Sequence, residues 1–160
     1  MVAGVSKQPG PRRTFEDEFV AALKAAGVEA VQSYTVIPAD GQADQAVLEK
    51  GVRDVGADGV LITRLVKTQR ETRVEPGRIY GPGYGRGFYG WYGSAWGGVY
   101  EPARVYQYDI VTAETSVYGL TTDQLLWSGT TETFDPRDVA KETPSFAKII
   151  IDSLKKQGVI

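Results

Sequence analysis

The stretch ADQAVLEKGVRDVGADGVLITRLV, residues 43–66, decides the fold of this chain. As far as Val55 its apolar side chains recur at helical spacing, and Gly56 then supplies the left-handed residue that commonly ends a helix. The run from Gly59 to Val66 is almost continuously apolar, which predicts a mostly buried strand. A helix, a glycine and a buried strand in succession are typical of a sheet whose parallel strands are joined by crossover connections.

The same arrangement stands 29 residues upstream, where Gly27 takes the place of Gly56. A helix is expected from about Thr14 to Ala26, with Thr14 as its N-cap. A strand is expected over residues 29–37, and the first residues of the chain look like the end of another strand. Because the 29 residues between Gly27 and Gly56 match the length of a βαβ unit, the strands that follow these two glycines should be parallel.

Downstream of Val66 polar and apolar residues alternate, so that strand should continue into a ribbon. Residues 105–118 and 125–134 are rich in Thr, Tyr and Val and predict an antiparallel hairpin. A last helix, interrupted near Pro144, should follow. The expected order is β-α-β-α-β-(Gly/Tyr insertion)-β-β-α, which is an α/β (α+β) fold with a single mixed β-sheet and helices packed on it. A chain of 160 residues fits one domain over residues 1–160, with an insertion at about 77–103.

The insertion has an unusual composition, because residues 77–98 hold nine of the 19 glycines together with seven aromatic residues. That much glycine disfavours a packed helix or central strand, and flexible linkers do not carry so many large rings. A recognition surface is expected, since Tyr and Trp bury a large area with few rotatable bonds. The expected binding residues are Tyr84, Phe88, Tyr89, Trp91, Tyr92 and Trp96. Two alternatives stay open: the rings cover a face of the sheet, or the loop is a neutral spacer.

No catalytic or metal-binding motif stands out in the sequence. The chain has no Cys and no His, which removes thiolate and imidazole ligands, and its net charge of −2 disfavours a nucleic-acid partner. Gly85 to Gly90 reads G-x-G-x-x-G, but the residues that follow cannot begin the helix that a dinucleotide site needs. We therefore expect no cofactor, no metal and no enzyme activity. The enzymatic alternative is a carboxylate-based glycan hydrolase, or a glycan-binding module, that uses Glu114 and Glu132 on neighbouring strands.

Several runs of residues resemble a group of uncharacterised bacterial cell-envelope lipoproteins. These runs are Arg13–Phe19, Ala57–Leu61, the Tyr/Gly-rich segment, Glu114–Thr115 and Leu126–Thr130. The expected element order is also similar to the α/β domain of envelope accessory proteins, namely the amino-terminal domain of the Tol translocation protein, the lipoproteins that activate penicillin-binding proteins, and the curli secretion lipoprotein. The resemblance implies a binding or assembly module and not an enzyme.

The resemblance also implies a location. In that group an export signal and a lipidated Cys precede the domain, so both are expected upstream of Met1, and the protein is expected at the periplasmic face of the envelope as an outer-membrane lipoprotein. The expected partner is an envelope protein or a second copy of this chain, with peptidoglycan as a further ligand. Contact with the membrane is expected only through the lipid anchor. A purely structural domain with a neutral loop is the remaining alternative.

Overall fold

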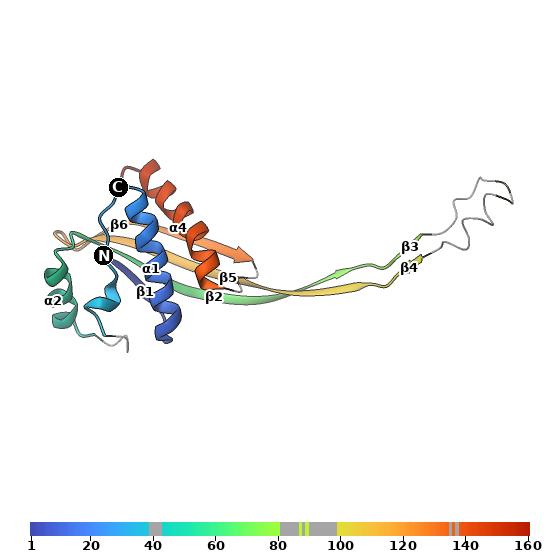
Figure 1. Cartoon of the computed structure of the whole chain (residues 1–160), viewed down its shortest axis with the longest axis horizontal. Coiled ribbons are helices and arrows are strands. Elements are labelled where there is room, and N and C mark those ends of the chain that lie inside the picture. Colours follow the sequence, from blue (N-terminus) through green and yellow to red (C-terminus); the bar gives the residue numbers. More distant parts are fainter. Residues whose placement is uncertain (39–42, 81–86, 88, 90–98, 135, 137) are drawn as a thin grey trace. The chain divides into compact units, whose positions relative to one another are not determined.

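The computed structural model describes residues 1–160 apart from 39–42, 81–86, 88, 90–98, 135 and 137 (Figure 1). The elements are β1 (Val2–Val5), α1 (Pro9–Ala25), a 3-10 helix η1 (Ser33–Thr35), α2 (Gln45–Val55), β2 (Gly59–Glu75), β3 (Arg78–Tyr80), β4 (Val99–Glu101), β5 (Arg104–Gly119), β6 (Gln124–Phe134) and α4 (Val139–Lys156). They fall into two compact units, Met1–Gln69 with Ile110–Ile160, and Arg70–Asp109. The expectation of a single domain over residues 1–160 stays a prediction.

The first unit contains a four-stranded sheet in the order β1-β2-β5-β6. Strand β1 runs parallel to β2, with Val2 opposite Leu61, whereas β5 and β6 form an antiparallel hairpin. The hydroxyl of Thr63 on β2 is hydrogen-bonded to that of Thr115 on β5, and further along β2 Arg70 donates to Asp109. Residue numbers rise on one strand as they fall on the other, so β2 and β5 run antiparallel. The sheet is therefore mixed. With the three α-helices among the described residues it confirms the expected α/β class and the closing hairpin. The parallel pair is β1 with β2, whereas the expected parallel strands included residues 29–37.

The core lies between one face of this sheet and helices α1 and α4, which lie side by side (Figure 1). The rings of Phe15 and Phe19 on α1 each lie within 6.0 Å, centre to centre, of Phe146 on α4. The buried residues of the core cluster are Val2, Phe19, Val20, Leu23, Ala30, Leu61, Val117, Trp127, Ala147, Ile150, Ile151 and Leu154. Burial of each large apolar side chain contributes about 1.5–3 kcal/mol, so this face of the sheet holds the helices in place.

Two expectations about the amino-terminal half were wrong. Residues 29–37 form no strand: they contain η1 and a single bridge between Val2 and Gln32, because the backbone turns there to bring Ser33 into the interior. Helix α1 begins at Pro9 and not at Thr14, since proline is well suited to the first turn of a helix.

The expected interruption of the last helix was also wrong, because α4 continues through Pro144 in its second turn. A proline inside a helix costs about 3 kcal/mol. Ala147, Ile150 and Ile151 are buried in the same helix, and their contacts with the core outweigh that cost.

Helix α2 has the expected bounds and ends at Gly56, whose φ is 61°. Its expected apolar side does not enter the core, because Val47 and Leu48 are 36% and 41% exposed. It contacts the segment after η1, where a Cβ on Gly51 would lie 3.3 Å from Cγ2 of Val36.

The second unit, Arg70–Asp109, is a two-stranded ribbon in the residues that the structure describes. The end of β2 pairs with the start of β5 through an ion pair between Arg70 and Asp109, and β3 pairs antiparallel with β4. Gly77 joins β2 to β3 at a point where the two strands of the ribbon come very close. A Cβ there would lie 2.5 Å from the carbonyl oxygen of Glu101. Only glycine fits this position without a shift of the opposite backbone.

Candidate functional site

The six aromatic residues expected to bind a partner fall mostly outside the described residues. Tyr84, Phe88, Trp91, Tyr92 and Trp96 lie there, and so does most of the insertion expected at 77–103. Tyr89 is described, and its side chain is 90% exposed. The binding role of these rings stays a prediction, and the ribbon that carries the segment is the part of the site with known geometry.

The ribbon has two open edges among the described residues. Strand β1 pairs with β2 only as far as Arg64, and β6 pairs with β5 only from Ile110 onward. Side chains from Arg70 to Arg78 on one strand and from Glu101 to Gln107 on the other are all exposed. Large apolar side chains are among them: Val74 (58%), Val105 (61%) and Tyr106 (43%). Unpaired backbone groups and exposed apolar side chains together are the usual features of a strand-docking surface.

Charged pairs across the ribbon fix its register. Nε of Arg70 donates to Oδ1 of Asp109 over 2.9 Å, and this hydrogen bond is the main reason why the pKa of Asp109 lies below its usual value. One residue further along, the hydroxyl of Tyr108 donates to Oε2 of Glu71 over 2.9 Å, which raises the pKa of Tyr108. These pairs hold the two strands of the ribbon together. Helices α1 and α4 belong to the other unit.

Where β2 passes into β3 the ribbon forms an open surface pocket of about 520 Å³. Its charged lining residues are Arg73, Glu75, Arg78, Glu101 and Arg104. A hydrogen bond involving Tyr106, then the charges of Tyr106, Glu101 and Glu75, raise the pKa of Arg104. The two carboxylates largely balance the three guanidinium groups, so this pocket offers little net charge to an ion.

The two carboxylates of the glycan alternative lie on neighbouring strands, as expected, and on the same face of the sheet. Glu114 stands opposite Thr130 and Glu132 opposite Thr112, so the two glutamates occupy diagonal positions. Oε2 of Glu114 accepts a hydrogen bond of 2.8 Å from Nε of Arg64, and Glu132 is exposed. Neither glutamate lines the pocket where β2 passes into β3. The expected lack of enzyme activity stays a prediction.

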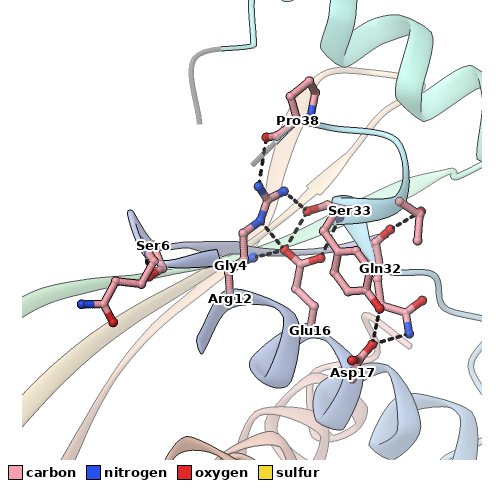
Figure 2. Close-up of polar contacts among 11 residues, drawn as sticks. Gly4, Ser6, Arg12, Glu16, Asp17, Gln32, Ser33 and Pro38 are labelled. Atoms are coloured by element: carbon pink, nitrogen blue, oxygen red, sulfur yellow. Dashed lines mark hydrogen bonds and ion pairs between the residues drawn. The ribbon is translucent and has the colours of Figure 1, made fainter. Parts of the chain in front are cut away.

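A buried polar cluster joins α1 to the segment around η1 (Figure 2). Arg12 donates from Nε to Oε1 of Glu16 over 2.9 Å, from Nη2 to Oγ of Ser33 over 2.9 Å, and from Nη1 to the carbonyl oxygen of Pro38 over 3.0 Å. Glu16 also accepts from the backbone N–H groups of Gly4 and Tyr34. Glu16 is 0% exposed and both of its carboxylate oxygens accept hydrogen bonds, so the cluster positions the loop and offers no reactive group.

One signal for this cluster is present in the sequence. Arg12 and Glu16 stand four residues apart on the helix, the spacing of a helical ion pair. Sequence reasoning missed the cluster because nothing local shows that both side chains turn inward, and Glu16 fits equally well as an acidic residue on the surface of the first helix.

An apolar groove opens at the end of the core, next to the first turns of α1 and α4. Its volume is about 340 Å³. Each strand of the sheet contributes one small residue to it: Gly4, Thr63, Ala113 and Thr133. On the first two strands the buried side chains of Val2 and Leu61 give way to Gly4 and Thr63 only two residues further along, and this loss of volume leaves room for the groove.

Apolar side chains surround the groove. Phe15 of α1 and Phe146 of α4 line it, and both pack against the core cluster. Leu65, Val5 and Val139 also line it and are 66%, 56% and 40% exposed. Large apolar surface around a concave site is typical of a binding site.

The described residues give no indication of a metal site, because they contain no group of three or more Asp or Glu side chains that could hold an ion. None of the described helices is both long enough and apolar enough to cross a membrane.

No family model and no curated protein matches the sequence. Among solved structures, the chain is similar to lipoprotein GNA1162 from Neisseria meningitidis, with 13% identity and a TM-score of 0.46 over 99% of this chain and 93% of that one. It is also similar to PelC from Paraburkholderia phytofirmans, a dodecamer, with 16% identity and a TM-score of 0.45 over 93% of this chain and 80% of that one. Similarities at this level identify neither a family nor a function.

Proposed function

We propose that this chain is a non-enzymatic binding or assembly module of the bacterial cell envelope, and that it contacts its partner through the Gly/aromatic segment, residues 77–98, and the adjoining ribbon. The observation that carries the proposal is the pair of open ribbon edges. A two-stranded ribbon is marginally stable in water by itself, and a third strand or a packed face normally supports it. A partner that supplies either would stabilise the exposed strands from Arg70 to Arg78 and from Glu101 to Gln107.

The ribbon would bind its partner by adding an extended segment of that partner to one of its open edges. Backbone N–H and C=O groups of the ribbon would pair with a partner strand, which supplies affinity without sequence specificity. The aromatic residues of the segment would supply specificity, because each ring buries a large area and Tyr and Trp retain a polar atom. The location in the envelope rests on the sequence resemblance given above.

The experiment that tests this function replaces the six rings Tyr84, Phe88, Tyr89, Trp91, Tyr92 and Trp96 by Ser. We expect nearly the same Tm as the wild type, together with loss of the proteins that wild type captures from a solubilised envelope extract. The matched control replaces Leu125 and Leu126, which are 52% and 54% exposed on β6, by Ser and should retain capture. Unfolding of the six-ring variant would show that the rings belong to the core, and equal capture by both variants would contradict the proposal.

A further inference from the structure

We propose that the apolar groove next to α1 and α4 receives an aromatic side chain from the Gly/aromatic segment of a second copy of this chain. The inference rests on the proposed function, which makes that segment the contact surface, and it goes further by naming the partner and the place where the ring binds. The groove belongs to the unit Met1–Gln69 with Ile110–Ile160, and the segment belongs to the other unit. Each copy therefore carries one groove and one Gly/aromatic segment that can enter the groove of another copy.

The shape and lining of the groove suit an aromatic side chain. A volume of about 340 Å³ with Phe15 and Phe146 along it gives a ring two aromatic neighbours, which prefer tilted or edge-to-face contact. The exposed Leu65 and Val139 would be covered by the incoming segment, so binding removes apolar surface from water on both copies. The small residues of the sheet, such as Ala113, leave the depth that a ring needs.

The polar groups of the groove disfavour an anionic ligand such as a free fatty acid. Pro9 and Pro11 have no N–H, so the first turn of α1 lacks two of the donors that helix starts normally offer to anions. At α4 the carboxylate of Asp138 already accepts from the backbone N–H of Ala140. The guanidinium of Arg12 donates to three oxygen atoms within the buried polar cluster, and so these donors are not free for a ligand.

Charge complementarity favours the Gly/aromatic segment over other apolar ligands. Asp138 and Glu142 line the groove and are both exposed, and Lys141 contacts Asp138 only at 3.8 Å. Residues 77–98 contain two arginines, Arg78 and Arg86, and no Asp or Glu. A ring in the groove would bring one of these arginines near the two carboxylates.

This contact is heterologous, since the surface given by one copy differs from the surface given by the next. Such contacts close into a ring when the rotation between neighbours allows it, and otherwise they continue into a filament. Self-association should therefore extend beyond a dimer as the protein concentration rises.

The first test measures self-association of the full chain by sedimentation velocity over a wide concentration range. Leu65→Asp places a charge on the groove and should weaken association by about tenfold or more, because burial of an unpaired charge at a contact centre is costly. Val66→Asp is the matched control: it is the next residue on β2, it is 54% exposed, and it lies on the opposite face. The control should associate as the wild type does, and circular dichroism checks that both variants are folded.

The second test exchanges charges between copies. Glu142→Lys and Arg86→Glu should each weaken association, because each substitution brings like charges together at the contact. An equimolar mixture of the two variants should recover part of the association, since only there does the new positive charge of one variant meet the new negative charge of the other. A mixture no stronger than the single variants would overturn the role of these charges and with it the chosen occupant.

The outcomes separate this inference from the proposed function. A wild type that stays monomeric at every concentration, or equal weakening by Leu65→Asp and Val66→Asp, overturns the groove as receptor. If the six-ring variant loses its envelope partners while Leu65→Asp associates normally, the proposed function stands and only the inference fails. If neither the six-ring variant nor Leu65→Asp changes any binding, both are wrong.

Discussion

Arg12 and Glu16 lie one turn apart on α1, and Nε of Arg12 donates to Oε1 of Glu16 over 2.9 Å with both side chains buried. The same carboxylate accepts from the Ser33 hydroxyl over 2.8 Å and from the backbone of Gly4 over 3.0 Å. One side chain thus ties together a helix, the first strand and the loop at η1 (Figure 2). Removal of a partner from such a pair leaves the other charge buried without compensation.

Substitution Glu16→Gln should destabilise the protein strongly. The guanidinium of Arg12 would remain buried beside a neutral amide, and breaking a buried ion pair in this way costs about 3–5 kcal/mol. Urea unfolding followed by circular dichroism gives the change in the free energy of unfolding, with the less buried Glu18→Gln on the same helix as control. A cost below about 1 kcal/mol, the range of an exposed pair, would show that water reaches Arg12 in solution.

The hydroxyls of Thr63 and Thr115 should behave as a coupled pair. They are hydrogen-bonded at 2.9 Å between β2 and β5, and Thr115 is 0% exposed. Thr115→Val should cost about 1–3 kcal/mol because the remaining hydroxyl is left unsatisfied, whereas the double variant with Thr63→Val should recover most of the loss. A double-mutant cycle of urea unfolding measures the coupling. Additive costs would contradict the hydrogen bond.

The ribbon should lose an ion pair in acid. The pKa of Asp109 is lowered, first by its hydrogen bond from Arg70, so the pair stabilises the ribbon above about pH 4 and this stabilisation is lost as the pH falls through the lowered pKa. Arg70→Gln should raise the pKa of Asp109 toward its usual value. Carboxyl carbon NMR shifts across a pH titration measure it, and Arg73→Gln serves as control. An unchanged pKa in Arg70→Gln would show that the pair does not form in solution.

Gly77→Ala should disrupt the ribbon without unfolding the sheet unit. The new methyl group would lie 2.5 Å from the carbonyl oxygen of Glu101 and 2.9 Å from the backbone nitrogen of Ala103, so one strand must shift. Faster amide hydrogen exchange in β3 and β4, with an unchanged Tm of the main transition, is the expected result. Gly87→Ala is the control, since a Cβ there meets nothing within 4 Å. Equal exchange rates in the two variants would contradict the close approach at Gly77.

Elements with strong local signals could be predicted from the sequence. The strands β5 and β6 are rich in Thr, Tyr and Val, and the helix α2 ends at a glycine, so their bounds were correct within about two residues. The strand expected over residues 29–37 failed because a tertiary contact outweighed local propensity. Those residues have suitable β-formers, but Ser33 is held in the interior by Arg12 and Glu16.

Only one part of the candidate site, the Gly/aromatic segment, could be predicted from the sequence. The Gly/aromatic segment could be found from composition alone, because its density of rings and glycines is unusual. The groove could not, since it depends on one small residue from each of four strands and on two phenylalanines, Phe15 and Phe146, that lie far apart in the chain. Only the register of the strands brings these residues together.

The pairing of Val2 with Leu61 has a consequence for how this fold assembles. The first strand cannot join its neighbour until almost 60 further residues have left the ribosome, and the contact of Phe15 on α1 with Phe146 on α4 must wait still longer. Contacts so distant in sequence slow folding, and they leave a nascent chain with uncovered hydrophobic surface. The hairpin of β5 and β6 is the local contact that can form early, so the amino-terminal strand and helix are expected to dock last, onto a partly built sheet.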